Sequence, residues 1–211
     1  MLDDNYKEIK FSKRGLYKEK GSKFISYAFP VYCEEHVKER IEEVKRLEYA
    51  AQHYCYAYIL YPDKSVQKVS DDREPSSTAG RPILGQILSN NLTNILIIVT
   101  RYFGGVKLGT SGLIHAYKTA AYDAISQTVS VIKTMKEEYE VSFKYPQMND
   151  VMRIVKEHDL EVVNTDFQIE CKLILLVAKN KVDMIVTTLH RNHKLTIKHI
   201  KKNNEITKKN V

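Results

Sequence analysis

Cysteine is scarce in this 211-residue sequence and forms no recognisable pattern. The three cysteines, Cys33, Cys55 and Cys171, are widely spaced, and none belongs to a C-x-x-C pair. This spacing argues against a disulfide framework and against a cysteine zinc site. We interpret all three as small buried hydrophobic residues.

Long apolar runs are also missing. The run Ile95 to Val99 stops at Thr100 and Arg101, well short of the roughly 18 residues that a membrane-spanning helix needs. The first seven residues are polar and lack the apolar core of a signal peptide. We therefore expect a cytoplasmic protein without a membrane partner.

An excess of positive charge is confined to the C-terminus. The net charge is +7, yet residues 1–190 contain 26 Lys/Arg against 25 Asp/Glu. Residues 191–211 contain seven Lys/Arg and one Asp/Glu. The basic tail, residues 203–211, is interpreted as a solvated terminus or, alternatively, as an electrostatic arm for RNA or another polyanion.

Hydrophobic periodicity predicts an α+β protein of two domains, with a boundary between residues 133 and 134. In residues 1–133 the patterns alternate between strands and helices. We predict a hairpin over 14–20 and 23–29, a helix over 34–48, a strand over 53–61, a helix over 78–89, a strand over 95–100 and a helix ending near 127. The strand over 95–100 is almost continuously apolar, which is typical of a strand buried on both faces. The last helix is predicted to begin at an N-cap, Thr110 or Ser111.

Residues 134–202 follow a different order. Alternating and helical patterns predict strand, helix, strand, strand, helix and strand in about 65 residues. This is the split βαβ arrangement of a ferredoxin-like domain. The first of these strands is predicted to place Tyr139, Val141, Phe143 and Tyr145 on one face.

One predicted strand carries a stripe of tyrosines. Tyr54, Tyr56 and Tyr58 share one face by period-two alternation, and His53 and Cys55 share the other. The tyrosines could stack on bases. We favour aromatic surface covered by a helix, and we interpret His53 as a hydrogen-bonded core residue.

Glycine is sparse as well, and its distribution defines the candidate site. Six of the eight glycines lie between Asp71 and Leu113. Such a concentration indicates positive φ angles or close approach of the backbone to another group.

The stretch from Arg101 to Thr110 predicts an anion site. A buried strand, a glycine turn and a helix N-terminus together present free N–H groups and a favourable dipole. Thr110 stands where a P-loop has lysine, so the segment is not a P-loop, and Arg101 and Lys107 are the candidate charges. The predicted phosphate or nucleic-acid ligands are Arg101, Gly104, Gly105, Lys107, Gly109 and Thr110. The alternative is a tight turn whose glycines serve packing alone.

A second predicted motif is an acidic turn. Asp71, Asp72 and Glu74 suggest a metal or acid–base cluster, but in an extended segment Asp71 and Asp72 point to opposite faces. The Glu74-Pro75 step and the following Ser76, Ser77 and Thr78 favour a turn that caps the next helix over a metal site. We predict no catalytic residue, metal or cofactor. The motif turn comprises Asp71, Asp72, Glu74, Pro75, Ser76, Thr78, Ala79 and Gly80.

These blocks resemble the signature of a known family. D-D-x-E-P-S-x-T-A-G-x-P over residues 71–82 and R-Y-F-G-G-V-K-L-G over residues 101–109 are similar to the IMPACT family, including its bacterial members. The sequence H-Y-C-Y-A-Y over residues 53–58 resembles a third block, and the resemblance covers essentially the whole chain. It implies an N-terminal domain like ribosomal-protein and elongation-factor domain IV modules, followed by a ferredoxin-like domain.

The resemblance also implies a function. Eukaryotic members regulate translation under stress by competing for a ribosome-associated activator of a starvation-sensing kinase, and nucleic-acid binding is inferred for bacterial members. This chain shows no counterpart of the eukaryotic N-terminal partner-binding domain, so we do not carry the competition mechanism over. It has Arg73 and Ser77 where the family more often has glycine, and it also departs from the pattern at Ser111. A positive φ at residues 73 and 77 is therefore not predicted.

The leading hypothesis is a non-enzymatic, translation-associated regulatory protein. It binds RNA, the ribosome or a translation factor through the stretch 101–110, and the acidic turn orders that stretch or faces the partner. One alternative is an enzyme acting on a phosphorylated or nucleotide-like small molecule, with Asp72 or Glu74 holding a divalent metal. Another is a protein-docking module without RNA.

Overall fold

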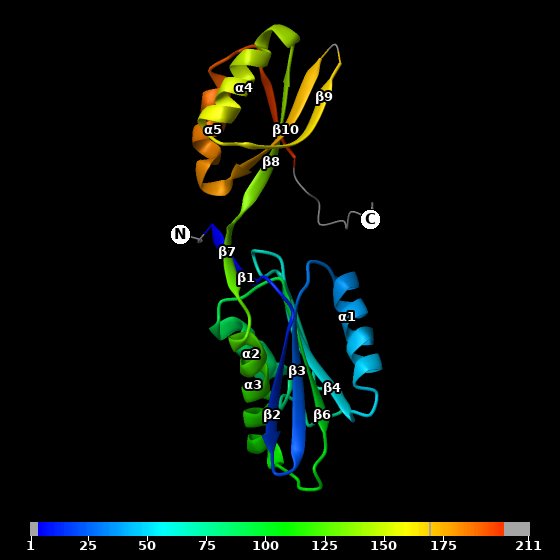
Figure 1. The fold of residues 1–211 in the computed structure, drawn as a ribbon. Helices are drawn as coiled ribbons and strands as arrows, with labels where there is room; N and C mark the ends of the chain where they lie inside the picture. Colours follow the sequence, from blue (N-terminus) through cyan, green and yellow to red (C-terminus); the bar gives the residue numbers. More distant parts are fainter. Residues whose placement is uncertain (1–3, 169, 201–211) are drawn as a thin grey trace. The chain divides into compact units, whose positions relative to one another are not determined.

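The chain divides into two compact units, which are described separately. The computed structural model describes residues 4–168 and 170–200, so the predicted basic tail lies outside the described residues. One unit is Asn5–Lys133, and the other contains the chain from Thr134 onward. Both combine helices with antiparallel sheets (Figure 1), which confirms the predicted α+β class.

The first unit is built on a five-stranded sheet. Its order is β2-β3-β6-β4-β5, with every neighbouring pair antiparallel. The strands are β2 (Lys13–Glu19), β3 (Ser22–Pro30), β4 (His53–Leu60), β5 (Val66–Ser70) and β6 (Ile95–Tyr102). As predicted, the central strand β6 is buried on both faces. A separate two-stranded sheet, which the sequence did not predict, pairs β1 (Asn5–Ile9) with β7 (Ser130–Thr134).

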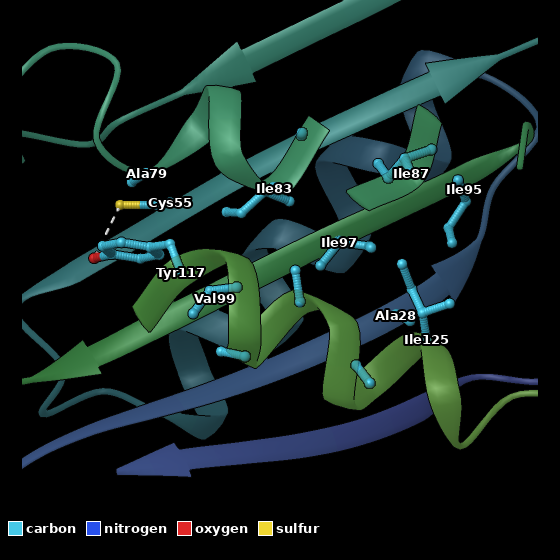
Figure 2. Packing of buried hydrophobic residues seen from close by; sticks show 14 of the residues in the cluster. Ala28, Cys55, Ala79, Ile83, Ile87, Ile95, Ile97, Val99, Tyr117 and Ile125 are labelled. Carbon is cyan, nitrogen blue, oxygen red and sulfur yellow. Dashed lines mark hydrogen bonds between the residues drawn. The ribbon is translucent and has the colours of Figure 1, made fainter. Parts of the chain in front are cut away.

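Three helices cover the two faces of this sheet. α2 (Gly80–Ser89) and α3 (Gly109–Ser126) lie on one face, and α1 (Glu34–Leu47) lies on the other (Figure 1). Figure 2 shows Ile83 and Tyr117 of the two helices packed over Ile97 and Val99 of β6. The opposite face packs Val37 and Val44 of α1 against other apolar side chains of the sheet.

The structure corrects three details of the predicted helices. Leu47 follows Val37, Ile41 and Val44 at helical spacing, which predicts a place on the same apolar face, but it lies in the last turn of α1 and is 62% exposed. The N-cap of α3 is Leu108, without a side-chain cap, so Thr110 and Ser111 lie inside its first turn. α2 begins at Gly80, two residues later than predicted, because the N–H groups of Ala79 and Gly80 donate to Asp71 instead.

The tyrosine stripe faces α1. The Tyr58 hydroxyl donates to Glu34 at 2.9 Å, and its ring is buried, as the helix-covered interpretation predicted. Tyr54 and Tyr56 lie on the same face and are half-buried. Cys55 is buried on the opposite face, whereas Cys33 is only half-buried, contrary to prediction.

The second unit has the predicted ferredoxin-like arrangement. Its sheet order is β11-β8-β10-β9, antiparallel throughout, with two helices packed on one face. The elements are β8 (Lys136–Phe143), α4 (Met148–Glu157), β9 (Glu161–Phe167), β10 (Cys171–Ala178), α5 (Val182–His190) and β11 (Thr196–Ile200), with short 3₁₀ turns at Tyr145–Gln147 and Lys179–Lys181. Tyr145 was predicted to continue the buried face of β8. It lies beyond the strand and is 73% exposed, because Pro146 ends the ladder.

Within residues 4–168 and 170–200, no helix has the length and apolar character required to cross a bilayer.

Candidate functional site

The carboxylate of Asp71, the first residue of the acidic turn, accepts three backbone N–H groups of that turn. One carboxylate oxygen accepts the N–H groups of Ala79 at 3.0 Å and Gly80 at 2.8 Å, and the other accepts the N–H of Ser77 at 2.9 Å. Burial opposes ionisation here, but these three backbone donors hold the pKa of Asp71 below its ordinary value. The carboxylate therefore closes the turn and accepts the N–H groups at the start of α2. The residues that the sequence favoured as the cap do not take this role: the N-cap is Ala79, without a side-chain cap, and the Thr78 hydroxyl donates to the Pro75 carbonyl.

The same turn holds residues with left-handed backbone angles. The φ values are 35° at Asp72, 68° at Arg73 and 64° at Ser77. Positive φ at residues 73 and 77 was not predicted, since neither is glycine. The hydrogen bond from the Ser77 N–H to Asp71 holds this conformation, which costs a residue with a Cβ on the order of 1 kcal/mol or more.

Asp72 attaches the turn to the start of β4. Its carboxylate accepts the Tyr54 N–H at 2.7 Å, and its carbonyl lies 2.8 Å from His53 Nδ1. The Arg73 side chain donates to the Gln52 carbonyl at 3.1 Å. Asp71 and Asp72 thus serve different donors and do not act as a chelating pair.

Glu74 lies at the centre of a buried polar cluster. Its side chain is 4% exposed, and Oε1 accepts Nη1 of Arg101 at 2.6 Å and the hydroxyl of Tyr117 at 2.9 Å. Nε2 of His53 lies 3.9 Å from the same oxygen. The Cys55 thiol lies 3.4 Å from the Tyr117 hydroxyl (Figure 2). Burial raises the pKa of Tyr117 and of Cys55 far above their ordinary values, so both stay protonated.

Arg101 is held inside the protein rather than on the glycine loop. It is 6% exposed, and its guanidinium lies 5.5 Å from the ring centres of Phe24 and Phe103. Its Nε has no hydrogen-bond partner among the described residues. Glu74 neutralises this buried charge. The ion pair therefore fixes the end of β6, from which the loop begins. A metal on Glu74 would have to displace Arg101 from the carboxylate.

The glycine loop, residues 103–108, rests on the turn between β2 and β3. The Gly104 N–H donates to Ser22 Oγ at 3.1 Å, and a Cβ at Gly104 would collide with the backbone of Gly21 and Ser22. The Phe103 N–H donates to Gln52 Oε1 at 2.8 Å. Gly104 is therefore required by close approach. Gly105, with φ 88°, is required by its backbone angle.

This contact creates one exposed surface from two distant segments. The loop contributes Phe103 and Val106, which are 46% and 51% exposed, and the exposed Lys107. The β2–β3 turn contributes the exposed Lys20. The start of β3 contributes Lys23, which is half-buried and lies over the ring of Tyr102 at 5.6 Å. We call these five residues, Lys20, Lys23, Phe103, Val106 and Lys107, the loop surface. The first turn of α3 begins beside Lys107 and has no side-chain cap.

The structure brings most of the predicted residues into two adjoining segments. Gly104, Gly105, Lys107, Gly109 and Thr110 follow one another through the loop and the start of α3. The motif turn runs from Asp71 to Gly80 behind Arg101. Sequence reasoning missed Tyr117, Gln52 and Ser22. Period-two alternation along β4 did place His53 and Cys55 on the correct face, whereas nothing in the sequence pointed to the contact with Ser22.

No metal-binding cluster is present in the part of the chain that the structure describes. There, no group of three or more His, Cys, Asp and Glu side chains is arranged to hold a cation.

The fold and the site define a class of two-unit α+β protein. In this class an acidic turn forms an ion pair, Glu74 with Arg101, with the end of the strand that precedes a glycine loop. The model of the Impact N-terminal domain matches residues 20–125. The chain is 34% identical to IMPACT family member YigZ of Escherichia coli over 151 residues, 71% of this chain and 74% of that protein. This chain belongs to the IMPACT family.

Other relatives extend the comparison. IMPACT family member YvyE of Bacillus subtilis is 33% identical over 136 residues, 64% of this chain and 63% of the relative. Protein IMPACT of Homo sapiens is 32% identical over 103 residues, which cover 46% of this chain and 31% of the human protein. A crystal structure of a hypothetical protein aligns with a TM-score of 0.72 and 28% identity, covering 95% of this chain and all of that one.

Proposed function

We propose that this chain is a cytoplasmic, non-enzymatic regulatory protein of translation that binds RNA through the loop surface. The observation that carries the proposal is the contact of Gly104 with Gly21, which joins Lys20, Lys23 and Lys107 into one basic surface. Neither residues 20–23 nor residues 103–110 contain Asp or Glu. Family membership supports the same reading, because the resemblance implies a role in translation.

The loop surface suits a flexible polyanion. Lysines neutralise phosphates without base specificity, and an exposed aromatic ring such as that of Phe103 offers a face on which a base stacks. The uncapped N–H groups at the start of α3 add a favourable dipole for a phosphate. Single-stranded segments of ribosomal or messenger RNA combine both features.

The acidic turn has a supporting role in this proposal. Glu74 holds Arg101 at the end of β6, immediately before Phe103. The turn therefore sets where the loop begins, and its carboxylates point inward or to backbone donors rather than repelling phosphate.

The proposal is tested by binding of purified ribosomes and of a single-stranded RNA across a salt series. Lys20→Ala/Lys107→Ala should weaken binding and flatten the log–log salt slope by about 0.7 for each phosphate that the variant no longer neutralises. The matched control is Lys38→Ala/Arg46→Ala, which removes two exposed cations from α1. Equal slopes for wild type and the loop variant would refute the site. Ribosome capture that resists high salt would indicate protein docking instead.

A further inference from the structure

The two edge strands of the five-stranded sheet, β2 and β5, differ in how neighbouring elements contact their backbones. At β2, the Leu16 N–H donates to the Asp123 carboxylate of α3 at 2.8 Å, and Gly15 lies so close to α3 that a Cβ would strike its backbone. At β5, β4 is the only strand paired with it in the described part of the chain. An unpaired edge is a template for another strand unless it is covered. Among the described residues, the β2 edge donates an N–H to a helix side chain, whereas α2 approaches the backbone of β5 closely at its last residue, Ser70.

A groove lies between the β5 edge and α2. It encloses about 480 Å³, within the usual range for a binding cleft. The lining residues include Lys68 and Val69 of β5 and Arg81, Leu84, Gly85 and Leu88 of α2. Val69 pairs with Ala57, which faces the core beneath α2, so the Val69 side chain points to the α2 side of the sheet. A strand added beside β5 would set alternate side chains against this groove.

Gly85 has no side chain to fill the groove, but glycine lowers the stability of the helix relative to alanine. Glycine inside a helix is less stable than alanine, because it loses more backbone freedom on folding. The φ of Gly85 is not positive, and a Cβ built there meets no atom within 4 Å. The backbone of α2 and its own packing therefore give no reason for glycine. The absence of a side chain preserves the space above the helix.

We propose that β5 and α2 form a docking groove for an extended acidic peptide of a partner protein, which pairs with β5 as an additional strand. Two cations beside the β5 edge select the occupant. Arg81 lies on the α2 face, and Lys68, which pairs with Tyr58, lies on the α1 face. The residues that line the groove include no carboxylate. Apolar side chains of the peptide contact Leu84, Leu88 and the backbone at Gly85, and its alternate carboxylates lie on the α1 face beside Lys68. This is peptide recognition by strand addition. The groove shares no residue with the loop surface.

The test is selection from a random 12-residue peptide library displayed on phage, with the full chain as the target. Enriched peptides should alternate apolar residues with Asp or Glu. Synthetic copies should bind at least tenfold more weakly to Gly85→Leu and to Lys68→Glu/Arg81→Glu. Bound peptide should also slow amide hydrogen exchange at the outward N–H groups of β5.

Controls separate this proposal from a folding defect and from the RNA proposal. Gly85→Ala should unfold at a temperature no lower than wild type, and Lys20→Ala/Lys107→Ala should bind the peptides as wild type does. The proposal is overturned if no peptide is enriched, if enriched peptides lack acidic residues, or if the groove variants bind them unchanged. A wild-type dimer that Gly85→Leu dissociates would also overturn it, because a second copy would then occupy the edge.

Discussion

Glu74 and Arg101 form a buried ion pair, with Nη1 of the arginine 2.6 Å from Oε1 of the glutamate and both side chains under 10% exposed. The two residues are distant in sequence and belong to the two motifs that the sequence singled out. Glu74 lies in the turn after β5, and Arg101 lies near the end of β6, just before the glycine loop. The pair therefore couples the conformation of the turn to the position at which the loop begins.

The first prediction concerns this pair. Glu74→Gln should lower the free energy of unfolding by about 3–5 kcal/mol, because it leaves the Arg101 charge buried without a counter-ion. Urea denaturation at pH 7 measures the change. The double variant Glu74→Gln/Arg101→Met should lose less than Glu74→Gln alone, since it removes the uncompensated charge as well. Equal losses in the two variants would show that Arg101 is not the group that makes Glu74 necessary.

The second prediction follows from the backbone at Ser77. Ser77→Gly should raise the free energy of unfolding by about 0.5–1 kcal/mol, because glycine adopts positive φ without the steric cost that a Cβ brings. The expected increase in the free energy of unfolding is smaller than the full steric cost of the positive φ, because glycine also raises the conformational entropy of the unfolded chain. Thermal and urea unfolding measure it. Ser76→Gly is the matched control. Its φ is not positive, so glycine there should lower stability, and a gain at both positions would contradict the argument.

The third prediction is a pH dependence centred on Asp71. The pKa of this carboxyl is lowered in the folded protein. The stability contributed by its ionised form is therefore fully present above the unfolded-state pKa, near 4. It is lost as the pH falls through the folded-state pKa. Asp71→Asn should be less stable than wild type by about 1.5–3 kcal/mol at pH 7, the worth of hydrogen bonds to a charged acceptor.

Urea denaturation from pH 7 to pH 2.5 tests this prediction. The difference between wild type and Asp71→Asn should narrow below about pH 4, where the wild-type carboxylate begins to take up a proton. Asp63→Asn provides a control carboxylate on the surface, since the exposed Asp63 accepts one backbone N–H, from Ser65. A difference that stays constant across the pH range would mean that the charge of Asp71 is not what the turn needs.

The sequence predicted what depends on periodicity and left out what depends on distant contacts. The burial of β6 followed from its continuous apolar run, and the ferredoxin-like order followed from alternating and helical patterns. The burial of Arg101 did not, because its partner Glu74 lies in a turn without periodicity and 27 residues away. The left-handed angles at Arg73 and Ser77 were missed for a similar reason. They accompany hydrogen bonds that form only when the turn closes around Asp71, from the Glu74 N–H to the Asp71 carbonyl and from the Ser77 N–H to the Asp71 carboxylate.

The last prediction concerns the contact between the glycine loop and the β2–β3 turn, on which the proposed RNA binding depends. Gly104→Ala places a methyl group against the backbone of Gly21 and Ser22. Overpacking of this kind costs about 1–3 kcal/mol, and the loop should separate from the β2–β3 turn to relieve it. Gly105→Ala is the control, since its Cβ meets nothing and the cost arises only from its φ of 88°.

Both variants are compared in urea denaturation and in RNA binding across a salt series. Gly104→Ala should weaken binding and flatten the salt slope by about 0.7 or more, because the β2–β3 turn that carries Lys20 separates from the loop that carries Lys107. Gly105→Ala should lose some stability and keep the slope, because the contact at Gly104 is intact. If Gly104→Ala remains folded and binds RNA with the wild-type slope, the two segments do not act as one surface. The phosphate contacts must then be sought outside the loop surface.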